Sequence, residues 1–458
     1  MPRDEGAAGA AVATIDMASI ETLIERHGVR TVILAATDPG GVQRGKRLTV
    51  PYFRDAATDG INFASFILYT TMIDDVLPHL FPTGIPDVMG VPDLNSFRIA
   101  GWEKDAAVVN MDLCLPDGTA TALCPRTELK RQIERAHKLG FTVKCSLELE
   151  FFLLPTKPEH FRSGHWSMPP LVAQDIHCYS VYEGHFWEPI VGALRDAFPE
   201  EIEGCAPEWG QGQFEANLRA TDPLRMADTA IWFKTAVKQL AARAGMTATF
   251  MAKLHENFSG NSGHIHMSLV DAKTGKPAFW DESGDKRMSE TFRQFIAGQL
   301  DTFHETTMFY APTHNSYKRF QSNSFAGVTR NWGIDNRTVG YRVVNESAKR
   351  ARLECRIGGA DLNPYTALAT MLGAGLRGIE KKLTPPPAGV GNCYETPGVE
   401  SVPTTLDAAL AAARDSKAIR EVLHPEFVDN LLRIGAFETS IFRSQVTDLE
   451  RRRYLEMA

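Results

Sequence analysis

The segment SLELEFFLL (146–154) places two glutamates inside an apolar run, and this pattern constrains the fold more than any other feature of the sequence. Glu148 and Glu150 are two positions apart, so in a β-strand both carboxylates leave one face while the leucines leave the other. An exposed strand face is the ordinary interpretation of such spacing, but the flanking apolar residues favour a buried strand. A buried carboxylate is tolerated only when it is paired or hydrogen-bonded, because burying it alone costs several kcal/mol.

The same spacing recurs in two further strand candidates, GHIHMSLV and ARLECRIGG, and another pair of acids brackets the Gly-rich turn PEWGQGQFE. The polar positions of these segments are His264, His266, Arg352, Glu354, Arg356, Glu208 and Glu215. Carboxylates with one imidazole suit hard divalent cations such as Mg²⁺ or Mn²⁺ better than Zn²⁺. The sequence therefore predicts a metal site whose ligands are Glu148, Glu150, Glu208, Glu215, His264 and Glu354.

A local charge reversal lies between Tyr317 and Arg356, where nine Lys or Arg residues face three acids in a chain of net charge −7. A solvated charge run is the ordinary alternative, but glycines and apolar residues interrupt this segment. The planar fork of arginine suits phosphate and carboxylate groups. Combined with acidic metal ligands, the segment indicates phosphoryl transfer. Since no Walker-A loop or dinucleotide fingerprint occurs, we expect the nucleotide to be held in another way.

Composition excludes several other classes of protein. With 458 residues, 43% of them hydrophobic and 23% charged, the chain is expected to form two or three soluble domains. A pI near 6.0 and the lack of a basic, aromatic-rich run argue against nucleic-acid binding. No apolar stretch of about 18 residues occurs, and Asp4 and Glu5 are atypical of a signal peptide, so we expect no membrane association and a cytoplasmic location. Seven cysteines without a CxxC pair are interpreted as buried thiols.

Periodicity and turn signals divide the chain into two parts. A small α+β domain is predicted from a helix at 16–28 and strands at 31–38, 42–50 and 106–114, followed by a linker at 115–125. A larger domain opens with a helix at 125–140. Its further strands are expected at 141–154, 212–219, 247–253, 264–270, 338–344 and 352–357. Its further helices are expected at 222–244, 288–304, 364–381 and 439–457.

Six motifs stand in an order that resembles the glutamine synthetase family over nearly the whole chain. They are ELE (148–150), E-x6-E (208–215), GHIHMSL (263–269), NSYKR (315–319), NR…R (336–342) and KRARLECRIGGADLNPY (349–365). The resemblance implies an α+β protein with an N-terminal β-grasp domain at 1–115 and a glutamine synthetase-like catalytic α/β domain at 120–458. It also implies an ATP-dependent ligase that phosphorylates the γ-carboxylate of L-glutamate before an amine displaces the phosphate. A dodecamer of two hexameric rings is expected, with each site between one subunit's β-grasp domain and the next subunit's catalytic barrel.

The resemblance also implies a role for each matched residue. Two or three metal ions per site would be held near the substrate by Glu150, Glu208 and Glu215, and at the nucleotide phosphates by Glu148, His264 and Glu354. The glutamate pocket would contain Arg319, Arg356 and Gly260. Phosphate contacts would be Arg337 and Arg342, and the predicted catalytic cations are Arg319 and Arg337. Nucleotide contacts would be His266, Ser268, Lys349 and Arg352. Tyr394 in NCYETP has a limited similarity to the family's adenylylation site.

The chain departs from the family pattern at the amine pocket. The ammonia-using members carry a flap glutamate after the YKR motif, and Phe325 stands at that position here. Ala64 replaces the aspartate that helps bind ammonium, and Ser259 replaces an asparagine of the glutamate pocket. Two carboxylates expected around an ammonium ion are therefore absent, although the metal and phosphate motifs are intact.

These departures favour a glutamate ligase for an apolar primary amine, either an alkylamine or an arylamine. One alternative is an ordinary glutamine synthetase with a rearranged flap. Polyamines or ethanolamine are alternative acceptors, although a diamine would favour acidic partners. A non-catalytic regulator of the same fold is disfavoured, because all six metal-ligand positions are filled.

Overall fold

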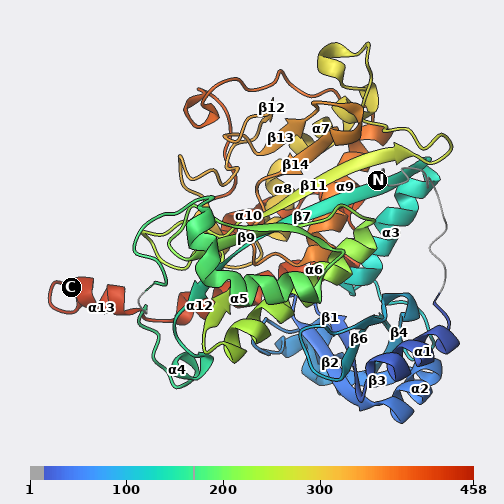
Figure 1. Cartoon of the computed structure of the whole chain (residues 1–458). Helices are drawn as coiled ribbons and strands as arrows, with labels where there is room; N and C mark the ends of the chain where they lie inside the picture. Colours follow the sequence, from blue (N-terminus) through green and yellow to red (C-terminus); the bar gives the residue numbers. More distant parts are fainter. Residues whose placement is uncertain (1–14, 169–170) are drawn as a thin grey trace.

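The computed structural model describes residues 15–168 and 171–458, and contains two β-sheets flanked by helices (Figure 1). Asp4 and Glu5, on which the signal-peptide argument depends, lie outside the described residues. Within the described part, no helix is long and apolar enough to cross a membrane. The predicted α+β class is confirmed.

The first sheet has six strands in the order β2-β1-β6-β4-β3, with β5 paired to β6. Its strands and the helices beside them are α1 (Met17–His27), β1 (Thr31–Thr37), β2 (Gln43–Thr49), α2 (Val50–Asp59), β3 (Ile61–Ala64), β4 (Asp87–Pro92), β5 (Arg98–Ile99) and β6 (Ala106–Cys114). Helix α1 begins where the Asp16 carboxylate accepts from the Ser19 backbone N–H, and ends at Gly28 in the left-handed conformation. A hydrophobic core of its own lies under this sheet.

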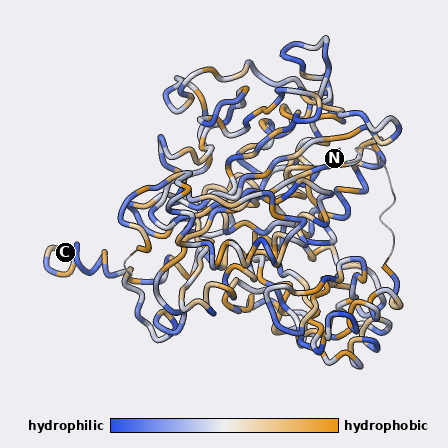
Figure 2. Tube along the Cα trace, in the orientation of Figure 1, coloured by the Kyte–Doolittle hydropathy of each residue, from blue (hydrophilic) through white to orange (hydrophobic). Residues whose placement is uncertain are grey.

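The second sheet has eight strands in the order β12-β13-β14-β11-β7-β9-β8, with β10 paired to β7. Its strands are β7 (Phe141–Leu154), β8 (Ile202–Pro207), β9 (Gln213–Leu218), β10 (Thr247–Thr249), β11 (Gly263–Asp271), β12 (Trp332–Ile334), β13 (Tyr341–Val344) and β14 (Arg352–Cys355). The helices of this part are α3 (Pro125–Lys138), α4 (Pro158–Arg162), α5 (Val181–Ala197), α6 (Pro223–Arg243), α7 (Glu290–Asp301), α8 (Phe303–Tyr310), α9 (Pro364–Glu380), α10 (Leu406–Arg414), α11 (Lys417–Val422), α12 (Pro425–Ser444) and α13 (Asp448–Tyr454). Helices α3 and α6 pack on β7, so one face of the sheet is covered and the opposite face is left for polar side chains. Apolar residues follow the strands and the helices behind them, and hydrophilic residues are frequent in the outer loops (Figure 2).

The two sheets are joined by a buried arginine. The Arg126 guanidinium on α3 is 1% exposed and lies 2.6 Å from Asp93, 2.7 Å from Asp112 and 3.0 Å from Asp228. Asp93 and Asp112 belong to the first part of the chain, whereas Asp228 lies on α6, where it also accepts a hydrogen bond from the Tyr365 hydroxyl at 2.5 Å. Three carboxylates thus compensate one buried cation and fix the first sheet against the helices of the second.

Several predicted boundaries were wrong. The helix expected at 288–304 is divided at Thr302, whose ψ of 22° interrupts the helix between α7 and α8. The helix expected at 439–457 is the end of α12 followed by the separate α13, because Thr447 caps a new helix. The strand expected to reach residue 50 ends at Thr49, whose hydroxyl caps α2, and Pro51 suits that helix start. All seven cysteines are free, but Cys178 and Cys205 are only partly buried.

Candidate active site

The register of five neighbouring strands brings the polar positions of the sequence motifs into one row. Residue pairs that face each other across the strands are Glu150 and Glu215, Glu148 and His264, His266 and Glu354, and Arg342 and Glu354. Directly opposed residues point to the same face with their Cβ atoms about 5 Å apart. The pairwise spacing seen in sequence therefore becomes a continuous polar surface on the face of the sheet opposite α3 and α6.

Glu150, Glu208 and Glu215 form a group of three carboxylates, here named the acidic trio. One carboxylate oxygen from each lies within 4.8 Å of the others, as metal ligands do. Burial, followed by the neighbouring Glu215, raises the pKa of Glu150 well above its ordinary value. Burial and the charge of Glu148 raise the pKa of Glu215 to about 8, and burial raises that of Glu208. Bringing three acids together without a cation is unfavourable, so the acidic trio is suited to a divalent metal ion.

Glu148, His266 and Glu354 form a second group with metal-ligand spacing, here named the paired group. His266 Nδ1 accepts from Arg352 Nε at 3.2 Å, so its proton lies on Nε2, which faces Glu148 Oε1 at 3.0 Å. Glu354 is 1% exposed and binds Arg342 Nη1 at 3.0 Å and Arg356 Nη1. Although burial opposes ionisation, Arg356 and the histidines lower the pKa of Glu354 to about 2.

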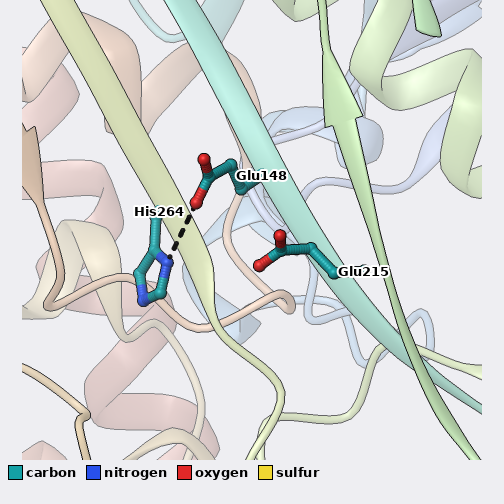
Figure 3. A group of neighbouring side chains, drawn as sticks. All are labelled: Glu148, Glu215 and His264. Atoms are coloured by element: carbon teal, nitrogen blue, oxygen red, sulfur yellow. Dashed lines mark hydrogen bonds and ion pairs between the residues drawn. The ribbon is translucent and has the colours of Figure 1, made fainter. Parts of the chain in front are cut away.

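His264 connects these two groups. Its Nδ1 atom lies 3.4 Å from Glu148 Oε2 and 3.7 Å from Glu354 Oε1, and Glu148, Glu215 and His264 form a third set with metal-ligand spacing (Figure 3). Burial, reinforced by Arg356, lowers the pKa of His264 to about 4. The imidazole is therefore neutral at physiological pH, which is the form that binds metals. All six predicted metal ligands lie in one continuous cluster.

The two arginines expected to clamp glutamate are buried beside this cluster, and each packs against a glycine. A Cβ atom on Gly260 would lie 2.3 Å from Arg319 Cγ, and one on Gly327 would lie 2.7 Å from Arg356 Cβ. Gly327 also has a φ of +67°, which favours glycine. The structure therefore confirms that Gly260 adjoins Arg319, and shows that the backbone after Phe325 passes directly over Arg356.

Phe325 lies at this second arginine. Its carbonyl oxygen accepts a hydrogen bond from Arg356 Nη2 at 3.1 Å, and its side chain is 48% exposed. Its φ of +55° is uncommon for a non-glycine residue and indicates a conformation imposed by the surroundings. An aromatic side chain thus stands where the sequence comparison expected a glutamate.

The four predicted nucleotide contacts line one cavity of about 760 Å³. His266 and Ser268 come from β11, Arg352 is the first residue of β14, and Lys349 lies just before that strand. Glu148 of the paired group also lines this cavity, so it lies between the acidic trio and the predicted nucleotide contacts.

The match to a family model agrees with this arrangement. Residues 122–454 match the model for "Glutamine synthetase, catalytic domain". The chain belongs to the glutamine synthetase family. The family's reaction is the ATP-dependent ligation of glutamate to a nitrogen nucleophile, and its members use divalent metals.

Several relatives within the glutamine synthetase family are similar over their full lengths. A glutamate–isopropylamine ligase from Pseudomonas sp is 35% identical over 448 residues, which covers 96% of this chain and 97% of the relative. The gamma-glutamylethanolamide synthetase GlnA4 of Streptomyces coelicolor is 34% identical, with 95% of each chain covered. The glutamine synthetase of Thermus thermophilus is 32% identical, with 96% and 98% covered. A solved structure described as a GmaS/ADP complex superposes with a TM-score of 0.84 at 27% identity, covering 95% of this chain and 99% of that one.

Other predicted residues of the glutamine synthetase site lie further apart. Arg342 is held between Asp335 and Glu354, whereas Arg337 is exposed and forms no ion pair within the described residues. Ala64 ends β3 in the first sheet, which lies in the lower part of Figure 1, away from β7 and β11. A single chain therefore does not bring Ala64 to its own metal cluster.

Three buried residues of the site were missed by sequence reasoning. The Gln213 amide donates to Glu150 Oε2 at 3.2 Å, to Gly260 O at 2.9 Å and to Asn261 Oδ1 at 2.8 Å. The Ser262 backbone N–H donates to Glu150 Oε2, and the Ser262 hydroxyl accepts from Arg319 Nη1 at 3.2 Å. Gln213 lies inside the quoted motif PEWGQGQFE, and Asn261 and Ser262 directly precede GHIHMSLV, so their position beside the charged residues was the available signal.

Proposed function

We propose that this chain joins the γ-carboxylate of L-glutamate to an apolar primary amine, using ATP and a γ-glutamyl phosphate intermediate. The observation that carries this proposal is the contrast within the site. The acidic trio, the paired group and the arginines are complete, whereas Phe325, 48% exposed and bonded to Arg356, stands at the family's flap-glutamate position. Phosphorylation of glutamate is thereby retained while the nucleophile differs from ammonia.

The reaction has two steps. An oxygen of the γ-carboxylate attacks the γ-phosphorus of ATP, and the bond between that phosphorus and the ADP oxygen breaks. The amine nitrogen then attacks the acyl carbon, the bond to the phosphate oxygen breaks, and the nitrogen loses a proton. In this proposal Arg319 and Arg356 hold the glutamate carboxylates, and Arg337 and Arg342 stabilise the phosphate charge.

The clusters fit divalent metal ions, which we infer to be Mg²⁺ or Mn²⁺, two or three per site. Carboxylate oxygens dominate the donor set, and the acidic trio lacks an ion-paired cation among the described residues. When bound, such ions neutralise the phosphate oxygens during transfer. His266, Ser268, Lys349 and Arg352 are then placed to hold the rest of the nucleotide in the adjoining cavity.

The preference for an apolar amine follows from solvation. Capture of ammonium requires carboxylates that replace its water and accept its proton, whereas Phe325 and Ala64 offer apolar surface. An alkyl or aryl group that buries about 100 Å² gains about 2.5 kcal/mol over ammonia, approaching a hundredfold in kcat/KM. The most similar of the relatives reported above, at 35% identity, is named for isopropylamine, which supports this substrate class.

We also propose that the site is completed by a neighbouring subunit in a dodecamer of two hexameric rings. Ala64 and the rest of the first sheet lie away from the cluster of their own chain, so they are available to a neighbour's cluster. Light scattering that reported an active monomer would refute the assembly.

The deciding experiment measures phosphate release with glutamate, ATP and Mg²⁺ while the amine is varied among isopropylamine, aniline, ethanolamine, putrescine and ammonium. We expect isopropylamine or aniline to give the highest kcat/KM. The highest value with ammonium would establish an ordinary glutamine synthetase, and the highest value with ethanolamine or putrescine a polar-amine ligase. No glutamate-dependent phosphate release would indicate a non-catalytic protein.

A pair of variants tests the role of the flap residue. Phe325→Glu should weaken turnover of the apolar amine more than turnover of ammonia. Phe186→Glu is the control, because Phe186 on α5 has a similar exposed fraction, 50% against 48%. An equal change in both variants would contradict the placement of Phe325 in the amine pocket.

A further inference from the structure

Tyr394 lies on a short loop that is fastened to the turn containing Arg337. The Cys393 backbone N–H donates to the Thr338 hydroxyl at 2.9 Å, and the Asn336 amide donates to Gly391 O at 2.9 Å. Asn336 and Thr338 flank Arg337 on either side. The loop is therefore held against the phosphate side of the site by contacts that do not involve the tyrosine side chain.

The Tyr394 ring packs against the catalytic core, and its hydroxyl oxygen is buried without a hydrogen-bond partner among the described residues. A hydroxyl taken out of water without a partner costs about 1–3 kcal/mol. Buried polar atoms of this kind point to a missing ligand when they face a site.

The groups around this hydroxyl are donors and cations. Burial raises the pKa of Tyr394, and the opposing influences come from the Arg356 and Arg319 guanidiniums and the backbone N–H groups of Phe325 and Ala326. Such groups can satisfy the lone pairs of the oxygen but cannot accept its proton. The proton of the Tyr394 hydroxyl therefore lacks an acceptor. The surrounding positive charge favours an anionic acceptor.

We propose that the Tyr394 hydroxyl binds L-glutamate by donating a hydrogen bond to a carboxylate held by Arg356. This assignment depends on the proposed function, because it takes glutamate as the substrate of the clamp. The carboxylate supplies the missing acceptor. Tyr394 is then a substrate-binding residue contributed by a loop outside the six motifs.

Steady-state kinetics of Tyr394→Phe test the assignment, because phenylalanine keeps the ring and removes only the hydroxyl. We expect the KM for glutamate to rise about tenfold or more, the range for a hydrogen bond to a charged group, with the KM for ATP changed less than about twofold. Tyr310→Phe is the matched control, since Tyr310 also has a buried hydroxyl without a partner but lies in the core on α8. Tyr394→Leu should show the same rise in KM for glutamate if loss of the hydroxyl is the cause.

Two results overturn the proposal. One is a glutamate KM in Tyr394→Phe within about twofold of wild type, and the other is an equal rise in the KM values for glutamate and ATP, which indicates a structural role. Failure of the proposed function is distinguishable, because the wild-type protein would then release no phosphate in response to glutamate.

Discussion

The acidic trio and the paired group lie side by side on one sheet, yet their charges are compensated in opposite ways. In the acidic trio, carboxylates face carboxylates, and the pKa values of Glu150 and Glu215 are raised. In the paired group, Glu354 binds two arginines and has a pKa of about 2. Carboxylates are buried in both groups, so the charges of the neighbouring residues decide whether a pKa is raised or lowered.

This contrast assigns different requirements to the two halves of the site. The acidic trio needs a cation from outside the chain before its three carboxylates can be ionised together. In the paired group, Glu354 is already ion-paired with Arg342 and Arg356, so a metal ion there competes with these two arginines. We therefore expect metal binding to lower the electrostatic free energy of the acidic trio far more than that of the paired group.

The largest expected effect is on catalysis, and it is common to both halves. Glu150→Ala and Glu354→Ala should each lower phosphate release by about a thousandfold or more while the oligomer stays intact, because a metal ion loses an oxygen ligand worth several kcal/mol. The measurement is glutamate-dependent phosphate release at saturating Mg²⁺. Turnover similar to wild type in either variant would refute the assignment of that residue as a ligand.

The second effect separates the halves by stability. In metal-free protein, Glu354→Gln should lower the unfolding free energy by about 3 kcal/mol, because Arg342 and Arg356 lose a buried partner. Glu150→Gln should leave it unchanged or increase it, because a repelled carboxylate is removed. Denaturant unfolding in the presence of EDTA measures the unfolding free energy of both variants. Equal destabilisation by the two substitutions would contradict the difference in charge compensation between the two groups.

A smaller effect is expected at the clamp. Arg356→Lys keeps the charge but loses the planar fork, so kcat/KM for glutamate should fall about tenfold or more. Lys381 forms a surface ion pair with Glu421. Lys381→Arg is therefore a control for the effect of exchanging lysine and arginine outside the glutamate clamp. If neither kcat nor KM for glutamate in Arg356→Lys moves more than about twofold, Arg356 does not clamp the substrate.

The smallest effect is the contribution of the acidic trio to the pH dependence of stability. Glu215 has a pKa of about 8 in the folded protein and an ordinary value of 4.5, so the folded state holds an extra proton between these limits. The contribution of Glu215 to the stability of the metal-free protein should therefore fall as pH rises from about 5 to 8, by about 1 kcal/mol or more. Glu354 has a lowered pKa, so its contribution is lost only below about pH 4.5 and gives no slope in this window.

Thermal melts across this pH range, with EDTA or with Mg²⁺, measure the slope. Added Mg²⁺ should reduce it, because the ion holds the deprotonated carboxylates. Glu215→Gln should also reduce it, and an unchanged slope in that variant would assign the titration to another group.

Sequence reasoning predicted the row of acidic and imidazole side chains because strand alternation fixes which side chains share a face. Glu148 and Glu150 could be assigned to one face without knowledge of the neighbouring strands. The division of the six predicted ligands between two metal groups followed only from the resemblance, since pairing such as that of Glu150 with Glu215 depends on register. Phe325 was identified at the amine pocket, but its hydrogen bond to Arg356 depends on a positive φ that the sequence does not specify.

The missed features are those set by tertiary contacts rather than by local pattern. Gln213 is an uncharged residue whose role comes from three acceptors on different segments. The division of the last predicted helix follows from the Thr447 cap, a local signal that the continuous charge pattern obscured. The buried hydroxyl of Tyr394 could not be predicted from the motif NCYETP, because the motif does not reveal which way the ring points.

The Arg126 cluster also governs the order in which the molecule can be completed during synthesis. Asp93 and Asp112 are translated before Arg126, and the third acid, Asp228, follows 102 residues after the arginine. A nascent chain that ends before α6 therefore lacks one of the three carboxylates that bind Arg126. The ion pairs that fix the first sheet against α6 are therefore completed only after the middle of the chain has left the ribosome.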